Sequence, residues 1–170
     1  MRDAGAQPLP GAHLDWREHA PYAPAYGDIY FSHDAAQETE RVFIAPSSLC
    51  DSPAPALFTV GELGFGTGLN FVATAAYVLR HTHARLHFIS FEAHPLRPDD
   101  WPRVAAELGR GALAALFAEL TRPPLALLGG WQRRVLAAGR VHYRCNPALH
   151  TFAHQANRHK EKLKYFNNIR

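Results

Sequence analysis

The chain has 170 residues, 47% of them hydrophobic and 19% charged, with a formal net charge of +3. This composition indicates one globular domain and excludes wholesale disorder. No apolar run reaches the roughly 18–20 residues of a membrane helix. The first ten residues lack the basic and apolar regions of a signal peptide, and two cysteines are too few for a disulfide scaffold. These features predict a soluble cytoplasmic protein without a membrane partner.

The charge is unevenly distributed along the chain. Residues 150–170 contain five Lys or Arg residues and one acidic residue, whereas the preceding 149 residues contain 13 basic and 14 acidic ones. Every lysine lies in this C-terminal stretch. A basic tail can bind nucleic acid through the phosphates. The alternative, which we favour, is that the shift in composition marks a frame change or a junction after about residue 145.

The first 55 residues give weak signals of secondary structure. Four prolines within residues 1–25 predict an extended arm. Residues 28–32 are β-prone, and residues 38–44 predict a helical turn that leads into a strand. Four aromatic residues of this region could stack on a flipped base or could simply attach the arm to the core. They are Trp16, Tyr22, Tyr26 and Tyr30.

The strongest pattern begins at residue 57. Residues 57–63 form a short, largely apolar run, as expected for a buried parallel strand. A glycine-rich turn follows at residues 64–68, and residues 69–79 have the apolar spacing of a helix. Residues 86–91 predict a second strand, which ends at Glu92.

The remaining elements complete an alternating pattern. Residues 99–108 and 112–120 predict two helices, and residues 131–136 and 141–143 predict a hairpin, or a third strand with its approach. Arg133 and Arg134 could contact the phosphates of a nucleic acid or could lie on an exposed hairpin face, and the sequence favours neither. This order of elements predicts an α/β domain with a parallel sheet and right-handed crossovers.

The turn carries the chemistry of a nucleoside-binding site. Its glycines permit positive φ and a close approach of the backbone to a ligand, and the helix that follows directs N–H groups at the same ligand. Glu92, at the end of the next strand, is placed to accept hydrogen bonds from both hydroxyls of a ribose. The Gly-x-Gly-x-Gly spacing and the preceding acid, Glu62, favour S-adenosylmethionine (SAM) over NAD. A plain strand-to-helix turn remains an alternative.

Several stretches of the sequence resemble the methyltransferase domain of the MnmC/MnmD family of bacterial tRNA wobble-uridine enzymes. The resemblance runs from about Trp16 to Tyr143, and its most specific part is Gly-Phe-Gly-Thr-Gly-Leu-Asn-Phe at residues 64–71. Supporting stretches are Asp-Ile-Tyr-Phe-Ser at 28–32 and Leu-His-Phe-Ile-Ser-Phe-Glu at 86–92.

The resemblance implies a class I SAM-dependent methyltransferase fold, which is Rossmann-like, with an N-terminal β-rich arm. It implies SAM-dependent methyl transfer to the exocyclic amine of 5-aminomethyl-2-thiouridine at the tRNA wobble position. SAM is the implied cofactor, tRNA the implied partner, and no metal is expected. The resemblance places the SAM-binding site at Glu62, Gly64, Phe65, Gly66, Thr67, Gly68, Asn70 and Glu92. Asp28, Tyr30 and Ser32 are the candidates for the substrate side.

The sequence departs from the family pattern after the third predicted strand. After the third predicted strand the family continues with a Gly-Asp pair and later an Asp-Gly-Phe-Ala-Pro stretch with the aspartate at the reacting amine, and neither follows Tyr143 in this sequence. The catalytic residue is therefore unknown. We expect an incomplete methyltransferase fold in three segments: an N-terminal arm with the substrate side at 1–55, a partial SAM-binding Rossmann-like domain at 56–145, and a basic tail unlike the family at 146–170. The alternative function is a non-catalytic truncated remnant that at most binds SAM.

The departure also affects the expected sheet. Without a fourth strand, residues 58–63 would form an exposed apolar edge, which has no lysine or proline to prevent pairing with other chains. A partial domain buries less surface, so we expect marginal stability. A short helix near residues 155–166, without firm docking, is expected in the tail.

Overall fold

The computed structural model describes residues 9–31, 34–123 and 125–147. The strands are β1 (Asp15–Arg17), β2 (Ala20–Ala23), β3 (Asp28–Ile29), β4 (Leu57–Leu63), β5 (Arg85–Phe91), β6 (Gln132–Leu136) and β7 (Val141–Asn146). The α-helices are α1 (Ala35–Thr39), α2 (Leu69–His81), α3 (Trp101–Leu108) and α4 (Ala114–Thr121). Short helical turns are η1 (Glu40–Ile44), η2 (Ser48–Cys50), η3 (Pro98–Asp100), η4 (Gly111–Leu113) and η5 (Ala137–Gly139). The expected tail helix lies outside the described residues.

The main sheet has the strand order β4-β5-β7-β6. Strands β4, β5 and β7 are parallel, and β6 is antiparallel to β7. The α/β class and the parallel pairing are therefore confirmed, but the sheet is mixed. Because only residues 137–140 separate β6 from β7, this connection is too short for a crossover and permits only a hairpin. Both interpretations of residues 131–143 therefore hold in part: β6 and β7 form a hairpin, and β7 is also the third parallel strand of the sheet.

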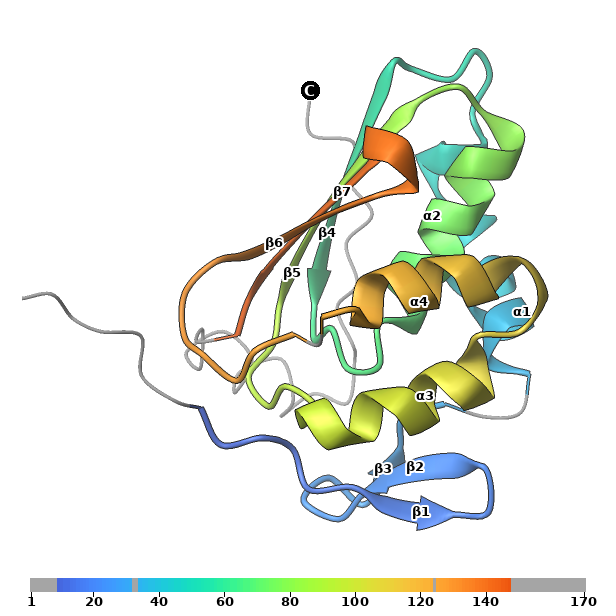
Figure 1. The fold of residues 1–170 in the computed structure, drawn as a ribbon. Helices are drawn as coiled ribbons and strands as arrows, with labels where there is room; N and C mark the ends of the chain where they lie inside the picture. Colours follow the sequence, from blue (N-terminus) through green and yellow to red (C-terminus); the bar gives the residue numbers. More distant parts are fainter. Residues whose placement is uncertain (1–8, 32–33, 124, 148–170) are drawn as a thin grey trace, which may run out of the picture.

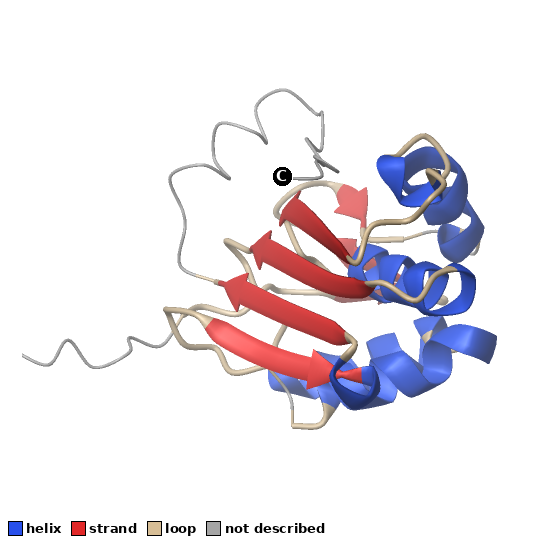
Figure 2. Ribbon diagram, turned by 90° about the horizontal axis from the view of Figure 1, so that it is seen from above, coloured by secondary structure: helices blue, strands red, loops and turns tan. Residues whose placement is uncertain are grey.

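The two faces of the main sheet differ. Alternate residues of β4, β5 and β7 are buried, because successive side chains of a strand point to opposite faces. Helices α1, α2 and α4 lie on one side of the sheet (Figures 1 and 2). The core on that side contains Phe58, Phe71, Phe88, Phe117 and Tyr143, all at most 1% exposed. The opposite face is only half-buried and carries no helix of the described residues.

The N-terminal segment is more ordered than an extended arm. Strands β1, β2 and β3 form a small antiparallel sheet, which lies beside α3 in Figure 1. The expected β-rich arm is thus confirmed, but residues 15–23 form a hairpin, with Glu18 in the turn at a φ of +56°. The helical turn expected within residues 38–44 is present, but the strand into which it was expected to lead is wrong. These residues continue α1 as a π-helical turn, and Ile44 at its end is 1% exposed in the shared core.

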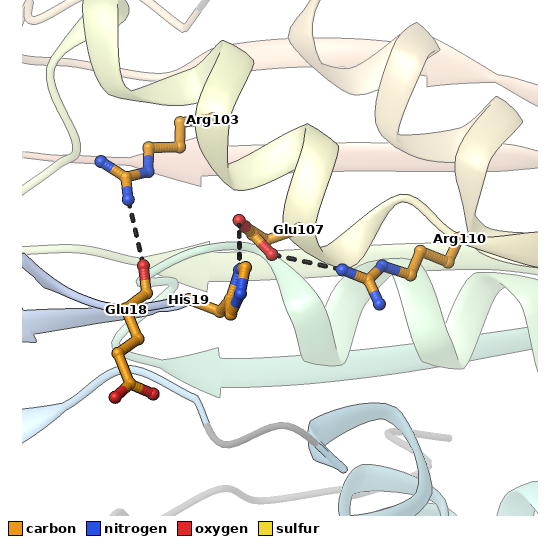
Figure 3. Close-up of polar contacts among 5 residues, drawn as sticks. All are labelled: Glu18, His19, Arg103, Glu107 and Arg110. Atoms are coloured by element: carbon orange, nitrogen blue, oxygen red, sulfur yellow. Dashed lines mark hydrogen bonds and ion pairs between the residues drawn. The ribbon is translucent and has the colours of Figure 1, made fainter.

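The β1–β2 hairpin is attached to α3 by polar contacts (Figure 3). The ring Nδ1 of His19 lies 3.1 Å from Glu107 Oε1, and Arg110 Nη2 lies 3.3 Å from Glu107 Oε2. The hydrogen bond from His19 lowers the pKa of Glu107. Arg103 donates a hydrogen bond to the Glu18 carbonyl and covers the Trp16 ring at 4.0 Å. These contacts favour the structural role that the sequence left open for Trp16.

The N-terminal segment shares one core with the main sheet. Phe31, Ala35, Ile44 and Leu49 belong to the same buried cluster as the side chains between the sheet and its helices. Ala12 N–H donates to the Pro95 carbonyl at 2.8 Å, which fixes the chain before β1 next to the end of β5. No helix of the described residues is long and apolar enough to cross a membrane.

Strand β4 lies at one end of the main sheet, as expected for residues 58–63. Within the described residues it pairs only with β5, whereas β5 pairs on both sides. We expect the β4 amides that do not pair with β5 to exchange with solvent faster than those of β5. Hydrogen exchange measured by NMR tests this expectation. Uniformly slow exchange across residues 58–63 and across residues 153–170 would mean that the tail completes the sheet, contrary to our expectation.

Candidate functional site

The glycine-rich turn joins the carboxyl end of β4 to the first turn of α2. Gly64, Gly66 and Gly68 have φ values of +83°, +55° and +74°, which disfavour any side chain. Gly68 is the N-cap of α2, and its N–H donates to the Phe65 carbonyl at 2.9 Å. A Cβ at Gly64 would meet no atom within 4 Å, so the backbone there faces open space. The turn therefore exposes backbone to a ligand at the amino-terminal end of α2.

Phe65 anchors the turn in the core. Its ring is 5% exposed and stacks on Tyr143 of β7, with centroids 4.8 Å apart. It also lies 6.3 Å from the ring of Phe71 on α2 and 6.2 Å from that of Trp101 on α3. Among the predicted SAM-binding residues, Phe65 thus has a clear packing role. Thr67, at 4% exposure, is likewise buried.

Glu62 and Asn70 form a buried hydrogen-bonded chain behind the turn. Asn70 Nδ2 donates to Glu62 Oε1 at 2.7 Å, and Thr39 Oγ1 donates to Asn70 Oδ1 at 3.2 Å. All three side chains are at most 8% exposed. This chain connects the end of β4, the first turn of α2 and the end of α1, and it holds the Glu62 carboxylate in a fixed place. The sequence analysis did not identify Thr39, because nothing local links it to residue 70.

Glu92 joins the turn to the end of β5. Its Oε2 accepts a hydrogen bond from Gly66 N–H at 2.6 Å, and its Oε1 accepts one from His94 N–H at 2.7 Å. Its side chain is nearly buried, since the residue is 9% exposed. A carboxylate has about four lone-pair sites, so two acceptor sites remain for other donors. The predicted proximity of the glycine turn and Glu92 is present in the structure.

The substrate-side candidates occupy different positions. Tyr30 packs on the turn, because a Cβ at Gly66 would lie 3.2 Å from its ring. Burial, followed by the charge of Glu92, raises the pKa of Tyr30. Asp28 is exposed, and its carboxylate accepts a hydrogen bond from the N–H of Ile29. Ser32 lies outside the described residues.

The other aromatic residues of the arm are less close to the turn. Tyr26 makes an edge contact with the ring of His94, with centroids 5.7 Å apart, and remains 45% exposed. Arg17 covers the Tyr22 ring at 3.5 Å. Tyr22 therefore contributes to the hairpin, whereas Tyr26 lies beside the residues that follow Glu92.

A small pocket lies beside Glu92 at the carboxyl ends of the strands. It is lined by Gly66 and Glu92, by the apolar side chains of Leu96, Trp101 and Leu125, and by Cys145 of β7. In this structure it has room for about one water molecule. Cys145 is 4% exposed, and burial is the main cause that raises the pKa of its thiol to about 11. Cys145 therefore lines the pocket as an uncharged thiol at pH 7.

The loop between α4 and β6 closes the pocket. The side chain of Gln132 accepts a hydrogen bond from Ala126 N–H at 2.9 Å and donates to the Ala126 carbonyl at 2.6 Å. It also lies 3.3 Å from the Leu128 carbonyl. These bonds tie the loop to Gln132, the first residue of β6. The sequence analysis missed Gln132 and Trp101, since their approach to Glu92 depends on how the loop and α3 pack.

Substitution of Gly68 tests the geometry of the turn. In Gly68→Ala the new Cβ would lie 2.8 Å from Phe65 Cζ and 3.1 Å from Leu120 Cδ2, in a residue with a φ of +74°. We expect unfolding to require about 2–4 kcal/mol less free energy, because left-handed strain adds to overpacking. Gly64→Ala is the matched control. Its backbone strain is similar but its Cβ meets open space, so a loss of about 1–2 kcal/mol is expected. Denaturant unfolding of both variants measures the difference, and equal losses would contradict the packing argument.

No group of three or more His, Cys, Asp or Glu residues within the described ranges could hold a metal ion. The histidines of the tail lie outside those ranges.

Comparison with known proteins identifies relatives for most of the chain. No family model matches. The chain is 38% identical over 148 residues to the tRNA 5-methylaminomethyl-2-thiouridine biosynthesis bifunctional protein MnmC of Methylobacillus flagellatus, with 79% of this chain and 21% of that protein aligned. It is 40% identical over 141 residues to the MnmC protein of Pseudomonas fluorescens, with 78% of this chain and 21% of that protein aligned. It also aligns with a crystal structure of MNMC2 from Aquifex aeolicus, at a TM-score of 0.49 and 19% identity, over 80% of this chain and 42% of that one.

The chain spans about a fifth of the length of the curated relatives that it matches. Identities of 38–40% over more than three quarters of the chain confirm the family resemblance drawn from the glycine turn and its flanking strands. Over these residues, the chain is a homologue of the bacterial MnmC proteins of tRNA modification.

Proposed function

We propose that the carboxyl edge of β4 and β5 binds SAM, and that the chain corresponds to the part of the MnmC proteins that transfers a methyl group to the exocyclic amine of 5-aminomethyl-2-thiouridine in tRNA. The observation that carries the proposal is the 2.6 Å hydrogen bond between Gly66 N–H and Glu92 Oε2. This bond holds Glu92, at the end of β5, against the glycine turn, whose backbone faces open space at Gly64. A cytoplasmic location follows from tRNA as the partner and is part of the same proposal.

The residues present have the donors and acceptors that SAM requires. Glu92 keeps two acceptor sites, which suit the two ribose hydroxyls. The buried Glu62 carboxylate, held by Asn70, lies behind the turn, and its charge would favour the ammonium group at the methionine end of SAM. Leu96, Trp101 and Leu125 offer an apolar wall for the adenine ring.

The pocket is too small for the adenosine part of SAM as it stands. Binding therefore requires an outward movement of the loop between α4 and β6. This movement breaks the hydrogen bond from Leu9 N–H to the Leu127 carbonyl, and it either breaks the bonds of the Gln132 side chain to the loop or carries the first residue of β6 along.

When bound, SAM supplies an electrophilic methyl group on a sulfonium. The described residues would orient it, and the buried core beneath Phe65 would keep the turn rigid. Such positioning is a main source of rate in methyl transfer. The base that accepts the amine proton remains unassigned.

Titration calorimetry with SAM, followed by competition with NAD, tests the proposal. We expect SAM to bind and NAD not to displace it. No SAM binding would contradict the proposal, and displacement by NAD would favour a small NAD-binding module. The second candidate function, a non-catalytic remnant, is favoured if SAM binds without any methyl transfer to tRNA. The absent Asp-Gly-Phe-Ala-Pro stretch is the observation on which this candidate depends.

A further inference from the structure

Four basic side chains lie next to one another on the half-buried face of the main sheet, opposite the helices. They come from three adjacent strands. In the strand register Arg133 of β6 is opposite Arg144 of β7, and His142 of β7 is opposite His87 of β5. Both arginines are exposed, and both histidines are partly exposed. We call His87, Arg133, His142 and Arg144 the cationic cluster, because its two arginines are charged at pH 7.

The arrangement is unfavourable for the isolated fold. Side chains directly opposite on neighbouring strands have Cβ atoms about 4.5–5.5 Å apart, and like charges at that separation destabilise the sheet. Among the described residues, no carboxylate forms an ion pair with Arg133 or Arg144. The positive charge of Arg144, after burial, also lowers the pKa of His87. An anion bound from outside would offset this repulsion.

The orientation of Arg133 is fixed by His142. Arg133 Nη2 lies 3.3 Å from His142 Nδ1, and His142 Nε2 lies 3.1 Å from the Gly139 carbonyl. A neutral His142 with its proton on Nε2 satisfies both contacts, since Nδ1 then accepts from the guanidinium. The neighbouring Arg134 and Arg140 instead donate to backbone carbonyls, of Pro123 in the first case and of Thr82 and Ala84 in the second. Arg134 and Arg140 thus have structural roles, and the arginines of the cationic cluster are oriented toward solvent.

An exposed aromatic residue lies on the same face. Trp131, which precedes β6, is 57% exposed and makes an edge contact with Phe91 of β5, with centroids 5.5 Å apart. An exposed indole beside exposed arginines is typical of single-stranded nucleic-acid surfaces, where aromatic rings stack on bases and cations contact phosphates.

We propose that the cationic cluster and Trp131 form an RNA-binding surface, in which Arg133 and Arg144 contact the phosphates and Trp131 stacks on a base. The choice of RNA over another polyanion rests on the proposed function. The surface adjoins the candidate SAM site, because Cys145, the residue after Arg144, lines the pocket and Glu92 N–H donates to the Asn146 carbonyl at 3.2 Å. An RNA held on this face therefore reaches the sheet edge at which Glu92 lies.

The salt dependence of RNA binding tests the phosphate contacts. The probe is an unmodified tRNA transcript, and the variants are R133Q, R144Q and the double variant, with R80Q on the exposed part of α2 as a control of equal charge change. We expect the slope of log affinity against log salt to fall by about 0.7–0.9 for each arginine of the cationic cluster, and by about 1.4–1.8 in the double variant. R80Q should leave it unchanged. An unchanged slope in the double variant, or an equal change in R80Q, would overturn the proposal.

Two further measurements separate the components. Trp131→Ala should weaken tRNA binding at least fivefold with little change in the salt slope, since stacking releases no counterions. If Trp131→Ala lowers the salt slope but leaves the affinity for tRNA unchanged, Trp131 does not stack on a base. Polyglutamate is the competing probe: if it binds as tightly as tRNA and responds to the same substitutions, the partner is an acidic polypeptide and RNA is wrong.

SAM titration distinguishes this proposal from the proposed function. The R133Q/R144Q double variant should retain the SAM affinity of the unsubstituted chain, because neither arginine lines the pocket. Absence of SAM binding in the unsubstituted chain would contradict the proposed function only. Unaltered RNA binding in the double variant would contradict the surface only.

Discussion

Replacing Glu92 with alanine is expected to weaken SAM binding at least tenfold. The ribose hydroxyls lose their common acceptor, and a charge-assisted hydrogen bond contributes about 1.5–3 kcal/mol, where 1.4 kcal/mol corresponds to tenfold. The structure adds a second reason. Gly66 N–H and His94 N–H also lose their acceptor, so the turn itself loses its fixed position. Titration calorimetry on both proteins measures the effect.

The stability of the variants separates these two causes. We expect Glu92→Ala to lower the free energy of unfolding by about 1–3 kcal/mol, since the partly buried hydrogen bonds from Gly66 N–H and His94 N–H to the carboxylate are lost. Glu92→Gln retains one side-chain oxygen and should lose less stability, yet should bind SAM more weakly than the unsubstituted chain. Asp51→Ala, at an exposed position before β4, is the control for loss of one negative charge. Equal SAM affinity in Glu92→Ala and the unsubstituted chain would exclude the ribose role.

We expect the 170-residue chain to methylate tRNA about 10²–10⁴-fold more slowly than a complete MnmC protein. The resemblance places an aspartate at the reacting amine, within an Asp-Gly-Phe-Ala-Pro stretch that the sequence does not contain. A positioned acid–base group typically contributes that factor. Cys145 lines the pocket beside Glu92, but burial keeps its thiol protonated, with a pKa of about 11. It cannot take the place of the aspartate as a base.

Radiolabelled SAM and tRNA that carries the aminomethyl group measure this transfer. A complete MnmC protein serves as the positive control, and the Glu92→Ala variant as the background. Turnover close to that of the complete protein would refute the argument from the missing stretch. SAM binding by calorimetry in the same preparation ensures that a low rate reflects the chemistry and not loss of the cofactor site.

The sequence alone determined the local units of the fold. The strand–turn–helix at residues 57–81 follows from an apolar run, three glycines and a helical repeat, all of which act over a few residues. The parallel pairing of β4 with β5 followed from the helix between them, because a crossover of that length places the second strand beside the first in the same direction. Local patterns gave wrong predictions where packing between distant residues outweighs them. Residues 38–44 have strand propensity, but the packing of Ile44 into the shared core overrides it.

Only the tertiary structure decided which distant groups meet. Thr39 reaches Asn70 because α1 packs against α2, and the carboxylate of Glu92, which the sequence had placed near the glycine turn, accepts its hydrogen bond from the N–H of Gly66. Strand register, set by the β6–β7 hairpin and by the pairing of β7 with β5, placed Arg133 opposite Arg144 and His142 opposite His87. These four pairs join residues that are between 11 and 55 positions apart. Their energies depend on burial and on distances that no local pattern encodes, so the sequence predicted the parts of the site and the fold alone assembled them.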